Sequence, residues 1–325
     1  MRAPLTALRE LFKESAYIYW VVLRISLPLL VAIRLLDEHF GIVAVVGDLL
    51  APIMDLVGLP GQAGIVWATA MLLNIYSALL VLISLWTQLE LNSAQVTTLM
   101  LIVLVAHALP IELRITQKAG VRFFAMLWVR ISGALAMGWL IHTIYNAGGW
   151  LQAPAHLLLS PPPMQSGWGP WFLGQAKNWA FIYLIIVTLV AFVRLLKITN
   201  TERLLIFLLA PILRTMGVGK KAVTITMVGM TLGISYGGAL LINESKKGDI
   251  SRRDMLCALT LLSLCHAVIE DTLLVMLVGA HISGVFFGRI IFSFVLMLFF
   301  AQLIKRLPDT TLEKIMLSRN PKTSS

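Results

Sequence analysis

The chain has 325 residues, of which 58% are hydrophobic and 13% are charged, and its formal net charge is +10. Soluble domains carry roughly 45–50% apolar and about 25% charged residues, so this composition excludes an ordinary soluble enzyme and a disordered protein. The basic residues stand between long apolar runs rather than on one polar surface, which excludes a nucleic-acid-binding protein. The sequence therefore predicts an all-α polytopic membrane protein in contact with the lipid bilayer.

Long apolar runs predict the membrane spans, because a crossing helix needs about 20 mostly apolar residues. Six runs have about this length: 15–36, 95–113, 121–145, 176–197, 255–279 and 283–304. Two further pairs of apolar segments are shorter or interrupted by Pro and Gly: 41–57 with 64–86, and 204–217 with 222–243. We expect six spans, two interfacial helices at 48–57 and 207–216, and two re-entrant hairpins at 64–86 and 222–243.

The distribution of Lys and Arg predicts the orientation, because cytoplasmic loops are enriched in both. Twenty of the 26 basic residues lie in five segments: 1–14, 114–122, 197–221, 244–254 and 305–325. None lies in four other segments: 37–63, 87–94, 146–176 and 272–282. Both termini are therefore predicted to be cytoplasmic.

The two halves of the chain repeat. A shift of 159 residues aligns them without a gap over roughly 49–135, and it matches LLAPI with LLAPI, His107 with His266, and Arg130 with Arg289. The first half is expected to begin inside and end outside, and the second half to do the reverse. Such inverted repeats build secondary transporters, whose substrate sites lie where broken helices meet. The predicted organisation is a first repeat (1–145), an external linker (146–175), a second inverted repeat (176–307) and a cytoplasmic tail (308–325).

The tips of the two hairpins are candidate substrate sites, because re-entrant backbone is tolerated only inside protein or beside a wet cavity. Polar side chains and accessible backbone occur at both tips: Asn74, Tyr76, Ser77, Ser235, Tyr236, Gly237 and Gly238. The alternative is that these small residues let the hairpin arms pack closely.

Ionisable residues at membrane depth form a second candidate site, because each costs at least about 2.5–3.5 kcal/mol to insert. Glu112 and Asp271 each follow the repeated His by five residues, and Glu270 is expected on the same helix face as His266. Pro110 is expected to interrupt the first of these helices.

Three interpretations of this group stay open. The His residues are packing residues, or members of a proton relay, or ligands of a divalent metal together with Glu270, Asp271 and either Glu112 or Cys265. Arg130 and Arg289 are expected to extend to the membrane interface, or else to neutralise Glu112 and Asp271 or an anionic substrate.

The LLAPI segment, the stretch SYGGALLINESKKGDISRRD at 235–254 and the stretch LCHAVIEDTLL at 264–274 resemble the Gate, or nucleoside-recognition, domain. That domain occurs in concentrative nucleoside transporters, in the membrane part of FeoB-type ferrous-iron permeases and in spore-maturation membrane proteins. The resemblance implies a transport fold in a bacterial or archaeal inner membrane. The chain has no GxxxxGK[ST] loop, so a GTPase domain is not expected.

The expected function is alternating-access transport of a small polar solute, nucleoside-like or another metabolite, coupled to protons or another cation. The alternative is a divalent-cation permease. An intramembrane enzyme ranks lower, because neither a nucleophile nor a metal motif is found, and so does a non-transporting scaffold. The expected partners are the bilayer and the solute or cation. No nucleic acid is expected as a partner. The sequence leaves open whether a divalent metal is bound as a cofactor and whether the protein forms a homo-oligomer.

Overall fold

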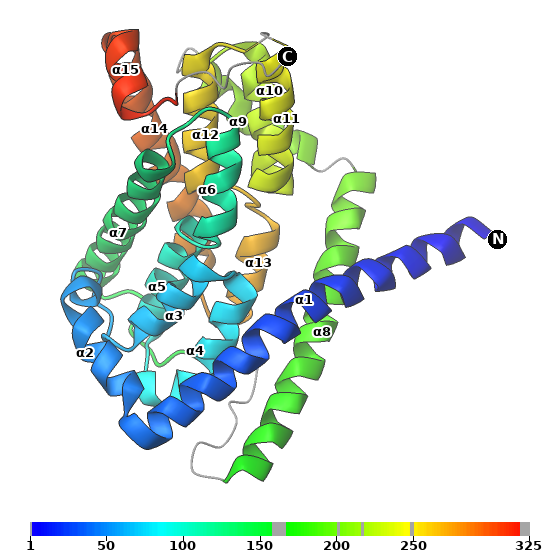
Figure 1. Cartoon of the computed structure of the whole chain (residues 1–325), viewed down its shortest axis with the longest axis vertical. Coiled ribbons are helices and arrows are strands. Elements are labelled where there is room, and N and C mark those ends of the chain that lie inside the picture. The colour runs from blue at the N-terminus through cyan, green and yellow to red at the C-terminus, as the bar shows by residue number, and fades with distance from the viewer. Residues whose placement is uncertain (1, 158–166, 200–201, 216–217, 248–249, 319–325) are drawn as a thin grey trace.

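The computed structural model describes residues 2–157, 167–199, 202–215, 218–247 and 250–318. Within these ranges the chain folds into helices, with two isolated β-bridges and no strand (Figure 1). Five helical segments are long and apolar enough to cross a membrane: Leu8–Phe40, Ser93–Lys118, Phe123–Gly148, Trp168–Leu195 and Ser283–Arg306. The predicted all-α polytopic fold is confirmed.

The first half of the chain holds seven of the described helices: α1 (Arg2–Phe40), α2 (Ile42–Asp55), α3 (Ala63–Leu72), α4 (Ile75–Leu89), α5 (Ser93–Val105), α6 (Leu109–Lys118) and α7 (Phe123–Gly148). The second half follows the same order: α8 (Trp168–Ile198), α9 (Glu202–Thr215), α10 (Lys220–Leu232), α11 (Ile234–Lys246), α12 (Arg252–Leu264), α13 (Glu270–Met276), the π-helical turn η1 (Ser283–Gly288), α14 (Arg289–Arg306) and α15 (Asp309–Ile315). Helices α5 and α12 begin 159 positions apart and end 159 positions apart, so the sequence repeat is also a repeat of elements.

The two halves point in opposite directions along the long axis of Figure 1. Helix α5 lies in the lower half of that view and α6 above it, whereas α12 lies in the upper half and α13 below it. The α3–α4 hairpin likewise occupies the lower half and the α10–α11 hairpin the upper half. This arrangement agrees with two inverted repeats. That the two repeats have opposite orientations in a membrane stays a prediction.

Two of the expected spans are broken in the middle. Ala108 separates α5 from α6 and Ala267 lies between α12 and α13, each with φ +45°. Left-handed backbone costs an Ala roughly 1–2 kcal/mol, and a neighbouring helix end stabilises each break. The Ala108 N–H donates to the Ala70 carbonyl oxygen, and the Val268 N–H donates to the Met230 carbonyl oxygen, both at 2.8 Å.

The sequence prediction was therefore wrong about an uninterrupted span at 255–279, because the break around His266 leaves α12 and α13 too short to cross alone. The expected interruption near Pro110 does occur, but the break lies just before this residue, at 106–108. Pro110 lies in the first turn of α6, where backbone N–H groups have no partner within the helix and a proline is therefore tolerated.

The shorter helices differ from their expected bounds at their ends. The expected interfacial helices begin earlier than predicted, at Ile42 and Glu202. Helix α8 begins at Trp168, inside the expected linker. The turns between hairpin arms fall at Leu73–Asn74 and at Gly233, which has φ +92°.

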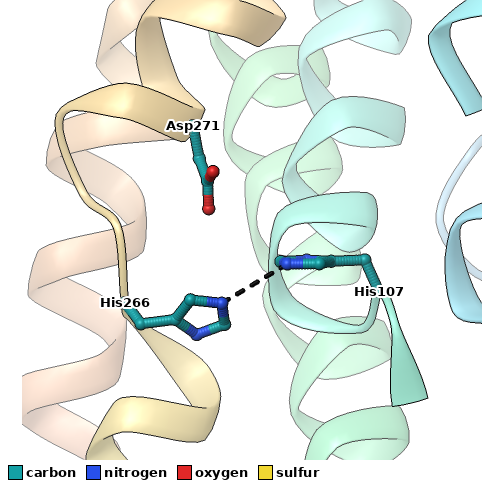
Figure 2. A group of neighbouring side chains, drawn as sticks. All are labelled: His107, His266 and Asp271. Atoms are coloured by element: carbon teal, nitrogen blue, oxygen red, sulfur yellow. Dashed lines mark hydrogen bonds between the residues drawn. The ribbon is translucent and has the colours of Figure 1, made fainter. Parts of the chain in front are cut away.

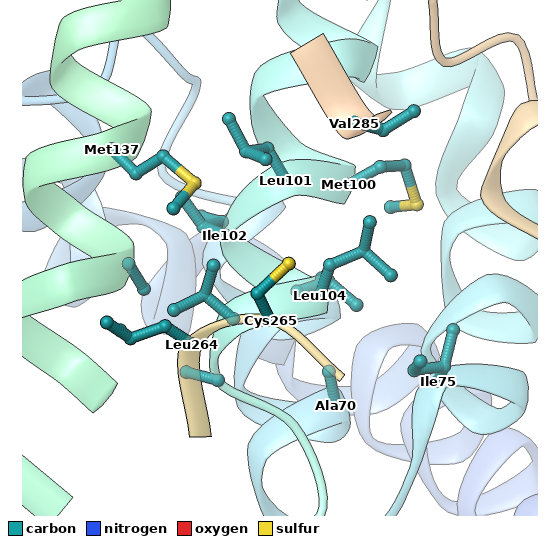
Figure 3. Packing of buried hydrophobic residues seen from close by; sticks show 14 of the residues in the cluster. Ala70, Ile75, Met100, Leu101, Ile102, Leu104, Met137, Leu264, Cys265 and Val285 are labelled. Carbon is teal, nitrogen blue, oxygen red and sulfur yellow. The ribbon is translucent and has the colours of Figure 1, made fainter. Parts of the chain in front are cut away.

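The core surrounds the end of α5. Every residue from Leu99 to Ala106 is fully buried, and a helix that is apolar on all sides belongs inside a protein. Figure 3 shows Ile102 and Leu104 of α5 in one cluster with Met137 of α7 and Leu264 of α12. The C-terminal ends of α5 and α12 therefore lie inside the protein, and the residues that follow them are buried too.

Candidate functional site

Two histidines meet where the broken helices cross. His107 follows α5 and His266 follows α12, and both side chains are buried. Their Nε2 atoms lie 3.3 Å apart, and the dashed line in Figure 2 marks this contact. The structure thus brings together the two residues that the repeat matches.

The other ring nitrogen of each histidine fixes its orientation. His107 Nδ1 lies 3.1 Å from the Val103 carbonyl oxygen, and His266 Nδ1 lies 2.7 Å from the Leu262 carbonyl oxygen. A carbonyl oxygen can only accept, so the Nδ1 atom carries a proton in both bonds. In the neutral imidazole, the lone pair then belongs to Nε2, the atom that faces the other histidine.

Glu112 joins the two histidines from the first turn of α6. Its Oε1 atom lies 3.2 Å from His107 Nε2 and 3.3 Å from His266 Nε2. These three atoms form a nearly equilateral triangle. The other oxygen, Oε2, forms an ion pair with Arg130.

Arg130 and Arg289 are fully buried, so the expectation that they extend to the membrane interface was wrong. Each binds the carbonyl groups that a broken helix leaves free at its C-terminus. Arg130 Nε donates to the Val105 oxygen at 2.9 Å. Arg289 donates to the oxygens of Leu264 at 3.3 Å and of His266 at 2.9 Å.

Asp271 supplies a second carboxylate from the first turn of α13. One of its oxygens and one nitrogen of each histidine lie within 4.8 Å of one another, and Figure 2 shows the carboxylate beside the two rings. Its Oδ2 atom is buried and makes no hydrogen bond within the described residues. Both acids thus lie at helix N-termini, where the helix dipole stabilises negative charge.

Among the described residues, His107, His266 and Asp271 form one group of neighbouring side chains, and Glu270 and Cys265 are not part of it. The expected shared helix face of His266 and Glu270 does not exist, because His266 lies in the break and Glu270 begins α13. Cys265 is buried as a free thiol among the apolar side chains of Figure 3.

The polar residues of the first hairpin make contacts within the protein. Asn74 caps α4, accepting hydrogen bonds from the Ser77 N–H at 2.9 Å and the Ser77 hydroxyl at 3.1 Å. The Ser77 hydroxyl also lies 2.5 Å from that of Ser26 on α1. Tyr76 lines an apolar pocket between α4, α8 and α13 with Leu79, Ile83, Ile182, Ile185, Leu274, Leu277 and Val278.

The glycines of the second hairpin allow close packing. A Cβ atom at Gly237 would lie 2.5 Å from the Cα atom of Gly229 on α10, and one at Gly238 would lie 2.5 Å from Ile115 on α6. Helix α11 therefore packs tightly on α10 and on α6. The side chains of Ser235 and Tyr236, two predicted substrate contacts, lie outside the described part of the structure.

Sequence reasoning missed two features of this centre. The hairpin carbonyl groups of Ala70 and Met230 stabilise the two breaks, and no pattern in the sequence marks them. The buried arginines bind helix ends, and for them a signal did exist. Arg130 and Arg289 match at the same offset as the histidines, which indicates a shared position in the fold rather than a lipid-facing one.

Comparison with known proteins supports membrane location and nothing narrower. No family model matches the chain, and no solved structure matches it. A curated relative, described as the uncharacterized membrane protein YvoD of Bacillus subtilis (strain 168), is 26% identical over 265 residues. The match covers 80% of this chain and 83% of the relative. The chain is a multi-pass membrane protein with a membrane-protein relative.

Proposed function

We propose that this protein is a secondary transporter that carries a small charged or polar solute through the crossing of its two broken helices. The observation that carries the proposal is the meeting of both breaks at one buried polar centre, with a helical hairpin on each side along the long axis. In transporters built from inverted repeats, discontinuous helices meet at such a centre near the membrane midplane.

The cost of the central charges favours transport over a scaffold. Glu112, Arg130 and Arg289 are buried, and each ionisable residue at membrane depth costs at least about 2.5–3.5 kcal/mol. A protein that only holds partners together has no need of them, since apolar side chains would fill the same space. Polar residues retained at this depth mark solute and ion pathways.

The packing of the hairpins supports alternating access. Each hairpin lies against its own repeat and against half of the broken helix of the other repeat, α11 beside α6 and α4 beside α13. Movement of one hairpin would therefore open the centre from one end while the other hairpin keeps it closed. In the proposed orientation both termini are cytoplasmic, and the proposed relationship is to the Gate-like transporters that the sequence resembles.

Uptake into proteoliposomes tests the proposal. Purified protein is reconstituted, and entry of radiolabelled divalent cations, nucleosides and small organic acids is followed with and without a pH gradient. We expect uptake of one solute class in the parent and none in Glu112→Gln, while Glu10→Gln on exposed α1 retains it. Failure of every class to enter faster than into protein-free liposomes would contradict transport.

A further inference from the structure

The central triangle brings together three atoms that repel one another unless something positive lies between them. His107 Nε2 and His266 Nε2 carry lone pairs when the rings are neutral, since both Nδ1 atoms donate to carbonyl oxygens. Glu112 Oε1 is a carboxylate oxygen, which in the ionised state only accepts. Three acceptors at 3.2–3.3 Å with no donor among them are an unstable arrangement in a buried site.

The size of the triangle matches a coordination sphere. Zinc binds imidazole nitrogens and carboxylate oxygens at about 2.0–2.1 Å in tetrahedral geometry, which sets neighbouring ligand atoms about 3.3–3.4 Å apart. The three observed separations are 3.2, 3.3 and 3.3 Å. They match the edges of such a tetrahedron.

Asp271 can supply a fourth ligand, and the groups for an outer shell are in place. Asp271 lies beside both histidines and has a buried oxygen without a hydrogen bond in the described residues. Metal-bound histidines usually donate their second N–H to a carbonyl oxygen or carboxylate, and metal-bound carboxylates are themselves held by hydrogen bonds. Both histidines donate to a carbonyl oxygen, and Arg130 holds Glu112.

We infer that this centre binds one divalent first-row transition-metal ion through His107, His266, Glu112 and Asp271, and that this ion is the transported solute. The second half of the inference rests on the proposed transport function, and the first half does not. Two imidazoles with two carboxylates suit zinc, iron or manganese, whereas magnesium and calcium prefer oxygen ligands alone. The ion neutralises the two carboxylates, while Arg130 and Arg289 bind the neighbouring helix ends.

Protonation is the competing way to fill the triangle. Two imidazolium rings could each donate from Nε2 to Glu112, which would give the proton relay. That state puts two cations 3.3 Å apart beside two buried arginines. The divalent ion brings the same total charge, but it places that charge between the three ligand atoms rather than on two rings in contact. The divalent ion needs two fewer protons and leaves the histidines neutral.

Equilibrium metal binding to the purified protein tests the inference. Full-length protein in detergent is stripped with a chelator and dialysed against Zn²⁺, Mn²⁺, Co²⁺ or anaerobic Fe²⁺, with Mg²⁺ as the comparison, and bound metal is measured by mass spectrometry. We expect about one transition-metal ion per chain and no Mg²⁺. The His266→Gln variant should bind at least about 100-fold more weakly, since removal of outer-shell partners alone costs about 10–100-fold.

His39→Gln is the matched control. His39 Nδ1 also lies against the carbonyl oxygen four residues earlier, at 2.9 Å from Leu35, but its side chain is exposed at the end of α1. This variant should bind metal as the parent does. If His266→Gln does not fold, Asp271→Asn takes its place. Absence of binding in folded parent protein, or parent-like affinity in a ligand variant, would overturn the inference.

The two proposals fail in different ways. Stoichiometric binding without flux of any solute would overturn transport and leave the metal site standing. Flux of a nucleoside or organic acid by protein that binds no transition metal would overturn the metal site and leave transport standing.

Discussion

Arg130 forms a buried ion pair with Glu112 and donates to the Val105 carbonyl oxygen, so one side chain connects the end of α5 to the start of α6. Removal of one partner of a buried pair leaves an uncompensated charge and costs about 3–5 kcal/mol. We therefore expect Arg130→Met to lower the free energy of unfolding in detergent by about that amount. The double variant Arg130→Met with Glu112→Gln should recover part of the loss.

Arg194→Met is the control for this experiment. Arg194 pairs with Glu14 at 2.6 Å between two partly exposed side chains, and such pairs contribute about 0–1 kcal/mol. Equal losses in Arg130→Met and Arg194→Met would show that the buried pair does not stabilise the break.

The contact between α10 and α11 should not tolerate a side chain. A Cβ atom at Gly237 would lie 2.5 Å from the Gly229 backbone, so Gly237→Ala must push the two arms apart. Overpacking of this kind costs about 1–3 kcal/mol, which thermal unfolding should detect. Gly169 on α8 has nothing within 4 Å of the same position, and Gly169→Ala should be neutral. A neutral Gly237→Ala would mean that the arms are not in contact.

The proposed orientation predicts which loops react with an impermeant thiol reagent. Ala153 is exposed in the segment that follows α7, and Asp309 is exposed in α15, which lies at the upper end of Figure 1. In intact cells Ala153→Cys should be labelled, and Asp309→Cys only after permeabilisation. Cys257 and Cys265 are buried, so background labelling should be low. The reverse pattern would invert the topology.

The two neighbouring acids of α13 should differ in their effect on metal binding. Asp271 lies beside both histidines, whereas Glu270 is not part of that described group. Asp271→Asn should weaken Zn²⁺ binding by more than about tenfold, as expected for loss of a ligand, and Glu270→Gln should leave it close to that of the parent. Titration calorimetry measures both. Equal effects would mean that their charge, rather than ligation, attracts the ion.

The fold class was predictable from the sequence because apolar runs and Lys/Arg placement report membrane burial directly. The repeat was predictable because His107 and Arg130 recur at one offset. For the first break the sequence offered only Pro110, which follows the break. No Gly or Pro lies within VAHA at 105–108 or in the equivalent LCHA at 264–267, so the positions of the breaks were not predictable. Ala108 takes left-handed backbone where the Ala70 carbonyl oxygen accepts its N–H, and that is a tertiary contact.

Only part of the candidate site was predictable from the sequence, because the rest depends on tertiary contacts. Sequence position placed Glu112 and Asp271 near the histidines in each half. It could not show that Glu112 contacts the histidines of both halves, since this depends on the crossing of α5 with α12. It also misplaced Glu270, because helical spacing does not extend across a break that the sequence does not reveal.

X-ray absorption spectroscopy of the zinc-loaded protein tests the central claim most directly. The account predicts about four nitrogen or oxygen ligands at about 2.0–2.1 Å, with the outer-shell scattering of two imidazole rings. One imidazole should disappear in His107→Gln and the other in His266→Gln. A spectrum without imidazole scattering, or one unchanged in both variants, would contradict a metal centre at the crossing of the broken helices.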